Sequence, residues 1–123
     1  MSNRPNVLLL FSDEHRHDAM GCAGHERVKT PHLDALAENG TRFTQAFTPS
    51  PICVPARAAL ATGQYVHQNR CWSNAEAYSG DPVSWGHHLT EQGHRVDSIG
   101  KLHYRGGETH NGFEEEILPL YIR

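Results

Sequence analysis

Cysteines, long apolar runs and clusters of positive charge are all scarce in this sequence. Its three cysteines, Cys22, Cys53 and Cys71, form no Cys-x-x-Cys pair and leave an odd count, so neither a disulfide framework nor a structural zinc site is indicated. The strongest apolar run near the start, residues 7–11, is shorter than a signal-peptide core and far too short to span a bilayer. These shortages predict a cytoplasmic protein with reduced thiols and no membrane partner.

The charge balance argues against nucleic acid as a partner. The formal net charge is -3 with histidine neutral, and no lysine- or arginine-rich run interrupts the chain. A length of 123 residues allows one domain at most. The ten histidines are the compositional excess, and we expect most of them to lie on the surface.

Alternating strand and helix patterns predict an α/β fold with a largely parallel central sheet. The apolar stretch 6–12 is typical of a strand buried on both faces, which would place Asp13 at its carboxyl end, where open α/β sheets bind ligands. Capping residues, stop glycines and β-branched runs then predict helices from Pro31 to Gly40, from Pro55 to Gly63 and from Pro82 to Gly93, and strands over 41–47 and 95–99. The acidic residues 114–116 favour a solvated face over a closing strand, so the chain is expected to end in mid-fold.

The pentapeptide from Cys53 to Arg57 has the spacing Cys-x-Pro-x-Arg and precedes a run of small residues. Cys53 is predicted at or just before a helix N-terminus, where free N–H groups and the helix dipole favour anions. The pentapeptide has two interpretations: a thiol beside a guanidinium, or the signature for converting cysteine into formylglycine. A cysteine-dependent phosphatase is disfavoured, because the position where its loop carries arginine is Ala59.

Separate segments of the chain offer groups that suit one site for hydrolysis of an anionic ester. They supply carboxylates for a hard cation, a nucleophile precursor, fixed positive charges and a proton carrier. The candidate residues are Asp13, Glu14, Cys53, Arg57, Asn74, Lys101 and His103.

On ordered matches along nearly its whole length, the chain resembles the N-terminal portion of a type I sulfatase of the alkaline phosphatase superfamily. The matching segments are 5–13, 21–24, 30–37, 40–43, 53–57, 62–65 and 100–103. Residues 51–57, 72–76 and 110–115 most resemble the branch of choline-sulfatases and phosphonate monoester hydrolases. The resemblance implies that residues 1–123 form part of the catalytic domain of a three-layer fold, with further metal ligands downstream.

For the chemistry, the resemblance implies sulfate-ester hydrolysis by a formylglycine derived from Cys53, made by a formylglycine-generating maturation enzyme. A divalent metal would be held by Asp13 and by the modified Cys53; whether Glu14 is also a ligand stays open. Many members have a second aspartate where this chain has Glu14. Calcium is expected, with manganese, magnesium and zinc as alternatives.

The resemblance also assigns roles to the remaining candidates. Arg57 would orient the formylglycine, Lys101 would bind a sulfate oxygen, His103 would hold or deprotonate the geminal diol, and Asn74 would contact sulfate. The substrate would be a small anionic ester. Two alternatives stay open, namely hydrolysis of phosphonate monoesters or phosphodiesters and a non-catalytic fragment of such an enzyme. A homo-oligomer is also compatible with the sequence.

Overall fold

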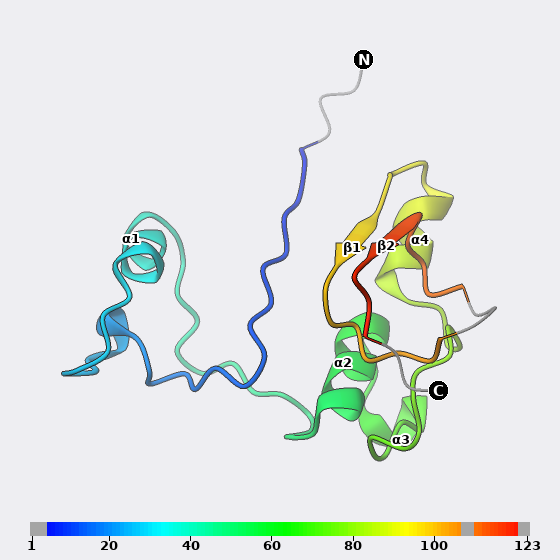
Figure 1. Cartoon of the computed structure of the whole chain (residues 1–123), viewed down its shortest axis with the longest axis horizontal. Coiled ribbons are helices and arrows are strands. Elements are labelled where there is room, and N and C mark those ends of the chain that lie inside the picture. Colours follow the sequence, from blue (N-terminus) through cyan, green and yellow to red (C-terminus); the bar gives the residue numbers. More distant parts are fainter. Residues whose placement is uncertain (1–4, 107–109, 121–123) are drawn as a thin grey trace. The chain divides into compact units, whose positions relative to one another are not determined.

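The computed structural model describes residues 5–106 and 110–120. The chain divides into two compact units, residues 1–46 and 47–123, and each is described by itself (Figure 1). No helix in the described part of the chain is both long and apolar enough to cross a membrane.

The first unit is built around one short helix, α1 (Pro31–Asn39), and the 3-10 turn η1 (Gly21–Ala23). The carboxylate of Asp34 joins them, since it accepts hydrogen bonds from the Cys22 backbone N–H at 2.7 Å and from the Thr30 hydroxyl at 2.9 Å. Hydrogen bonding, first of all from that backbone N–H, lowers the pKa of Asp34. The helix predicted from Pro31 to Gly40 is confirmed.

The strands predicted over 6–12 and 41–47 are wrong, because these residues, all of them described, adopt no strand. Val7 is 89% and Phe11 54% exposed. An apolar run becomes a buried strand only when neighbouring strands satisfy its backbone groups and helices cover its faces. Residues 5–46, the described part of the first unit, contain no strand, so the segments with a strand pattern find no neighbouring strand within this unit.

The second unit is organised around α2 (Cys53–Thr62). Gly63, with φ 69°, ends this helix as predicted, but the helix starts at Cys53 and not at Pro55. Small alanines allow close packing of its buried face. The core around it consists of Val54, Ala58, Ala61, Cys71, Tyr78, Val96, Tyr104 and Phe113. The short helix α3 (Val66–Asn69) follows α2 directly.

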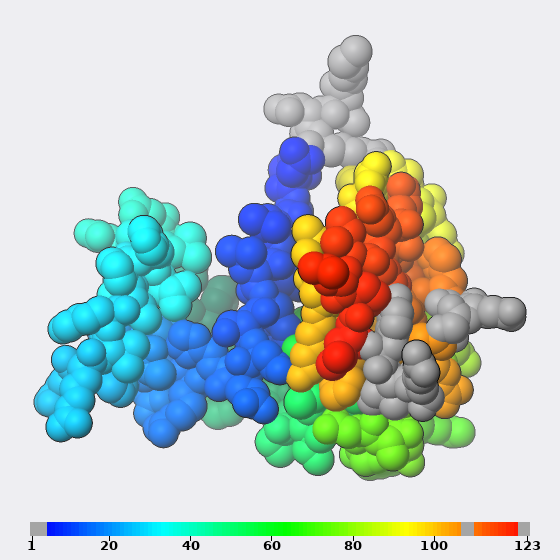
Figure 2. Space-filling model, in the orientation of Figure 1, coloured from blue at the N-terminus to red at the C-terminus, as the bar shows by residue number. Residues whose placement is uncertain are grey.

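A parallel pair of strands, β1 (Asp97–Ile99) and β2 (Glu115–Ile117), lies side by side in the second unit (Figure 2). Asp97 pairs with Glu115 and Ile99 with Ile117. The strand predicted over 95–99 is therefore confirmed in its second half, whereas the prediction that 114–116 forms no strand is wrong. Arg95 explains the difference, because its guanidinium donates to Glu115 at 3.1 Å and to Asp97 at 2.7 Å and so offsets the repulsion between these acidic side chains. Parallel strands together with helices confirm the α/β class.

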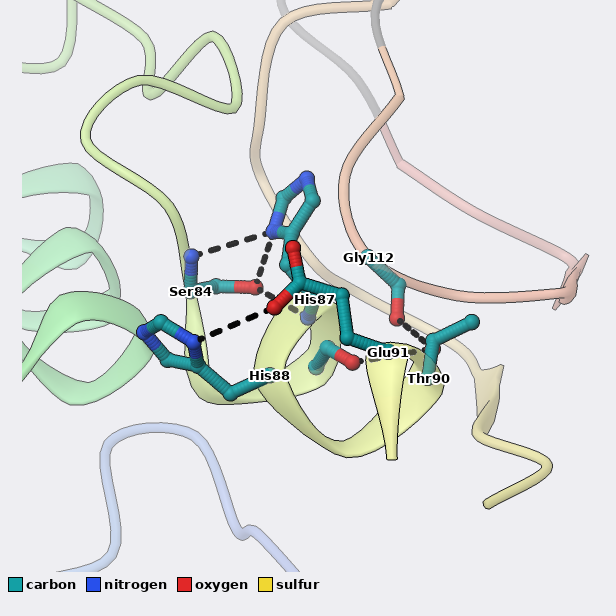
Figure 3. A network of polar contacts seen from close by, with 7 residues as sticks. Ser84, His87, His88, Thr90, Glu91 and Gly112 are labelled. Carbon is teal, nitrogen blue, oxygen red and sulfur yellow. Dashed lines mark hydrogen bonds and ion pairs between the residues drawn. The ribbon is translucent and has the colours of Figure 1, made fainter. Parts of the chain in front are cut away.

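The helix α4 (Trp85–Glu91) packs its first turn against residues 110–112 (Figure 3). The sequence predicts a helix from Pro82, capped by the preceding Asp81, to Gly93. The helix instead has Ser84 as its N-cap and ends at Glu91. The Ser84 hydroxyl, 2% exposed, donates to the Asn111 carbonyl at 3.2 Å, and the His87 ring pairs through Nε2 with the His110 carbonyl at 3.0 Å. Ser84 is the better cap because it is bonded on both sides of the contact between α4 and residues 110–112. A local Asp-Pro pattern carries no information about that contact.

Candidate active site

The N-terminus of α2 carries the predicted nucleophile. Cys53 is the first helical residue and is partly buried. The first four N–H groups of a helix have no intrahelical acceptor. The Ile52 N-cap supplies no side-chain acceptor, but the Val54 N–H donates to Asn74 Oδ1 at 3.0 Å. Asn74 therefore caps α2 from a loop that lies well beyond the helix in the sequence.

Lys101 places a positive charge beside this helix terminus. Its Nζ lies 3.9 Å from Cys53 Sγ. The lysine follows β1 through Gly100, whose φ of 93° favours glycine. The last residue of β2 and the segment after it hold this loop through the backbone: Gly100 N–H donates to the Ile117 carbonyl at 2.8 Å and His103 N–H to the Leu120 carbonyl at 2.8 Å. These bonds hold the backbone on both sides of Lys101 against the strand β2 and the segment that follows it.

Arg57 lies one helical turn after Cys53, so both side chains share a face of α2. The residue is only 7% exposed, and its guanidinium donates to the Lys101 carbonyl at 2.5 Å. This bond connects α2 directly to the loop that carries Lys101. The predicted contact of Arg57 with a formylglycine stays a prediction, and the structure adds a contact that fixes the neighbouring lysine.

His103 is partly buried and has a φ of 62°, a left-handed conformation that few non-glycine residues adopt. Such backbone strain gathers at functional sites, where the surrounding structure enforces it. Here the hydrogen bond from His103 N–H to the Leu120 carbonyl supplies that constraint. The proposed proton-carrying role of His103 is not tested by this geometry.

Buried tyrosines lie in the core of the same unit. Tyr78 and Tyr104 stack edge to face with ring centroids 4.9 Å apart. Burial raises the pKa of Tyr78 to about 12 and also raises the pKa of Tyr104. Burial likewise raises the pKa of the Cys71 thiol. These groups are therefore neutral at physiological pH, whereas the Lys101 ammonium beside Cys53 is a charged group.

Of the three predicted metal ligands, Asp13 and Glu14 lie in the first unit and Cys53 lies in the second. Asp13 and Glu14 form an exposed turn that follows the extended residues 5–12, and Glu14 has a φ of 58°. Their assignment as ligands stays a prediction. Of the sequence-predicted residues, the second unit brings together Cys53, Asn74, Lys101 and Arg57 through the contacts given above.

Three contributors to the site were missed in the sequence. The backbone carbonyls of Ile117 and Leu120 hold the lysine loop, and a backbone carbonyl leaves no residue signature. Glu76 accepts a hydrogen bond from the Trp72 N–H at 2.9 Å and so closes the loop that carries Asn74. A carboxylate at this position could have suggested a loop closure, but its partner could not be read from the sequence.

The second unit is an α/β unit with a parallel strand pair, in which the Lys101 ammonium lies beside the N-terminus of α2, an arrangement that favours negatively charged groups. Comparison with known proteins then gives the family. The Sulfatase family model matches residues 5–115, and the chain belongs to this family. The predicted resemblance to sulfatases is therefore confirmed.

The relatives include an ulvan-active sulfatase of Formosa agariphila, 38% identical over 105 residues that cover 85% of this chain and 21% of the relative. A choline-sulfatase of Rhizobium meliloti is 32% identical over 116 residues, covering 94% of this chain and 23% of the relative. The chain thus spans less than a quarter of the length of these relatives. Among solved structures, the phosphonate monoester hydrolase of Agrobacterium radiobacter matches with a TM-score of 0.81 and 29% identity, over 94% of this chain and 26% of that one.

Proposed function

We propose that this chain carries the nucleophile end of a site that hydrolyses sulfate esters. One observation carries the proposal: the Lys101 ammonium lies 3.9 Å from the Cys53 side chain, at the N-terminus of α2. A cationic group and a helix dipole act together on the same position, which favours a negatively charged ligand over a neutral one. Membership of the Sulfatase family makes a sulfate ester the substrate class of choice.

The surroundings of Cys53 fit a formylglycine at this position. An oxygen-bearing group that develops negative charge is stabilised by an ammonium and by a helix N-terminus. The side chain is partly buried and so keeps access to solvent. When formed, the hydrated aldehyde supplies a hydroxyl nucleophile and a second hydroxyl through which the product can leave.

The chain's own residues then have definable tasks. Lys101 would hold an oxygen of the sulfate group, because its ammonium is within a short distance of the nucleophile's position. Arg57 would keep that lysine in place through its hydrogen bond to the Lys101 carbonyl. His103, fixed by its backbone in the same loop, would hold or accept a proton from the nucleophile.

Asp13, Glu14 and the modified Cys53 are the residues that would hold a divalent metal. Carboxylate oxygens are the ligands that calcium, magnesium and manganese prefer, and the two acidic residues are exposed in a turn, so the donor set fits a hard cation. When bound, such a metal gathers the negative charge of the ester oxygens. We propose calcium as the first ion to test.

Phosphonate monoester hydrolysis is the second candidate, and the structural similarity to the phosphonate monoester hydrolase of Agrobacterium radiobacter favours it. A site that stabilises a tetrahedral sulfur centre offers the same charges to phosphorus. Parallel assays on an aryl sulfate and a phosphonate monoester, with the same preparation, would rank the two substrates.

The decisive experiment is the mass of the peptide that contains Cys53. The chain is co-expressed with a formylglycine-generating enzyme in the cytoplasm, and the digested peptide is measured by mass spectrometry. We expect the mass that corresponds to replacement of the thiol by an aldehyde. An unchanged cysteine in a preparation where a control substrate of the same enzyme is converted would contradict the proposal.

A further inference from the structure

The loop of residues 72–76 stands beside the N-terminus of α2 and makes a contact that the proposed chemistry does not use. Its Asn74 accepts the hydrogen bond from the Val54 N–H at 3.0 Å. Exposed connections are usually mobile, so a loop of this kind holds one conformation only when specific contacts restrain it. Here a set of hydrogen bonds within the loop provides that restraint.

Glu76 provides the longest-reaching of these bonds. Its carboxylate accepts from the Trp72 N–H at 2.9 Å, and its own N–H donates to the Ser73 carbonyl at 3.1 Å. The Ser73 hydroxyl also accepts from the Ala75 N–H at 3.2 Å. These bonds close the loop on both sides of Asn74, so the side chain of Asn74 is presented to α2 from a fixed base.

The contact at Val54 bears directly on Cys53. A peptide unit is planar, so the Cys53 Cα, the Cys53 carbonyl and the Val54 N–H move as one body. When Asn74 holds the Val54 N–H, it also fixes the Cα from which the Cys53 side chain projects. The distance of 3.9 Å between Lys101 Nζ and Cys53 Sγ depends on that direction.

We propose that Glu76 and Asn74 are positioning residues for Cys53: Glu76 closes the 72–76 loop, and Asn74, held by that loop, fixes the peptide unit between Cys53 and Val54. The inference rests on the proposed function for its catalytic meaning. The structural link itself is independent of formylglycine, metal and turnover. It gives Asn74 a task in addition to contact with sulfate, since Oδ1 accepts from the Val54 N–H whereas a sulfate oxygen would accept from the amide Nδ2.

The test follows the exchange of the Val54 amide proton with water by NMR in the full chain with Cys53 unmodified. Asn74→Ala removes the cap, and we expect Val54 exchange about fivefold faster, as for loss of a typical N-cap. Glu76→Ala is expected to accelerate it about twofold, since a solvent-exposed hydrogen bond is worth less. The Ala59 amide, deeper in α2, serves as internal reference and should keep its rate.

Conservative variants separate positioning from general damage. Asn74→Asp keeps an oxygen acceptor and should retain the wild-type Val54 rate. Glu76→Gln also keeps an acceptor for the Trp72 N–H and should likewise retain the wild-type exchange rate at Val54. Glu91→Ala removes an exposed carboxylate of the same unit, whose contact is a 3.8 Å ion pair with His88 on its own helix, and should change nothing at Val54.

The double variant Asn74→Ala with Glu76→Ala gives the sharpest result. If Glu76 acts through Asn74, the double variant exchanges no faster than Asn74→Ala alone. Three results would overturn the inference. The double variant could exchange its Val54 amide proton faster than Asn74→Ala by the full Glu76→Ala factor, or Glu76→Ala could keep the wild-type Val54 rate. The third result is an equal acceleration of exchange at the Ala59 amide. An unconverted Cys53 would contradict the sulfatase chemistry but would leave this result unchanged, so the two failures are distinguishable.

Discussion

The contact between α4 and residues 110–112 predicts a large penalty for one small substitution, Gly112→Ala. A Cβ at position 112 would lie 2.6 Å from the His87 backbone nitrogen and 2.7 Å from the Ser84 hydroxyl (Figure 3). Both atoms belong to the capped first turn of α4, so neither can move aside cheaply. Gly112 also has a φ of 92°, where an L-residue is strained.

The magnitude is the sum of two separable costs. The left-handed conformation costs about 1–2 kcal/mol for a residue with a Cβ. The steric overlap adds about 1–3 kcal/mol, the usual range for overpacking. Alanine recovers about 0.4–1 kcal/mol through the unfolded chain. We therefore expect Gly112→Ala to lower the free energy of unfolding by about 3 kcal/mol, on the combined scale of these costs.

Two other glycines of the same unit isolate these costs. Gly93 has a φ of 78°, but a Cβ added there would meet no described atom within 4 Å, so Gly93→Ala tests strain alone and should cost about 1 kcal/mol. Gly86 is helical, and its Cβ would lie 2.6 Å from the Gly112 carbonyl oxygen, so Gly86→Ala tests overlap alone. Better helix propensity offsets part of that overlap, which leaves about 1–2 kcal/mol.

Urea unfolding followed by circular dichroism measures all three variants against the wild type. The expected order of destabilisation is Gly112→Ala, then Gly86→Ala, then Gly93→Ala. If Gly112→Ala and Gly93→Ala were equally destabilised, the close approach of α4 to residue 112 would carry no energy, and the reasoning would be refuted.

Four further predictions concern the site and its core. Cys53→Ser removes the thiol whose oxidation the proposed function requires, so the chain co-expressed with a formylglycine-generating enzyme should lose labelling by an aldehyde-reactive probe that is expected to mark the wild type. Lys101→Met should weaken binding of inorganic sulfate about tenfold in an NMR titration, the loss of one charged hydrogen bond, while Lys101→Arg should retain most of it. Arg57→Met removes the bond to the Lys101 carbonyl and should lower the free energy of unfolding by about 2 kcal/mol in urea; a change within the error of the melt would contradict its role as a tie. Burial raises the pKa of Tyr78 to about 12 from its ordinary 10.0, so the stability it contributes is complete below pH 10 and falls as the pH rises toward 12; Tyr78→Phe should make that alkaline fall shallower in urea midpoints measured against pH.

Local signals in the sequence were reliable where a structure depends on nearby residues. The Thr-Pro start and glycine stop of α1, and the Gly63 end of α2, follow from backbone preferences within one turn. The strands predicted over 6–12 and 41–47 failed for the opposite reason. A strand exists only through partners elsewhere in the chain, and an apolar run cannot specify whether those partners are present.

The sequence by itself determined the family, the α/β class and the residue to propose as nucleophile, because the Cys-x-Pro-x-Arg spacing and its neighbours are local and specific. Only the tertiary structure decided what surrounds that residue. Lys101 reaches Cys53 across 48 positions, Arg57 reaches the Lys101 carbonyl across 44, and Asn74 caps Val54 across 20. Propensity and periodicity act over a few residues, whereas these contacts require a parallel strand pair and a closed loop to bring distant segments together.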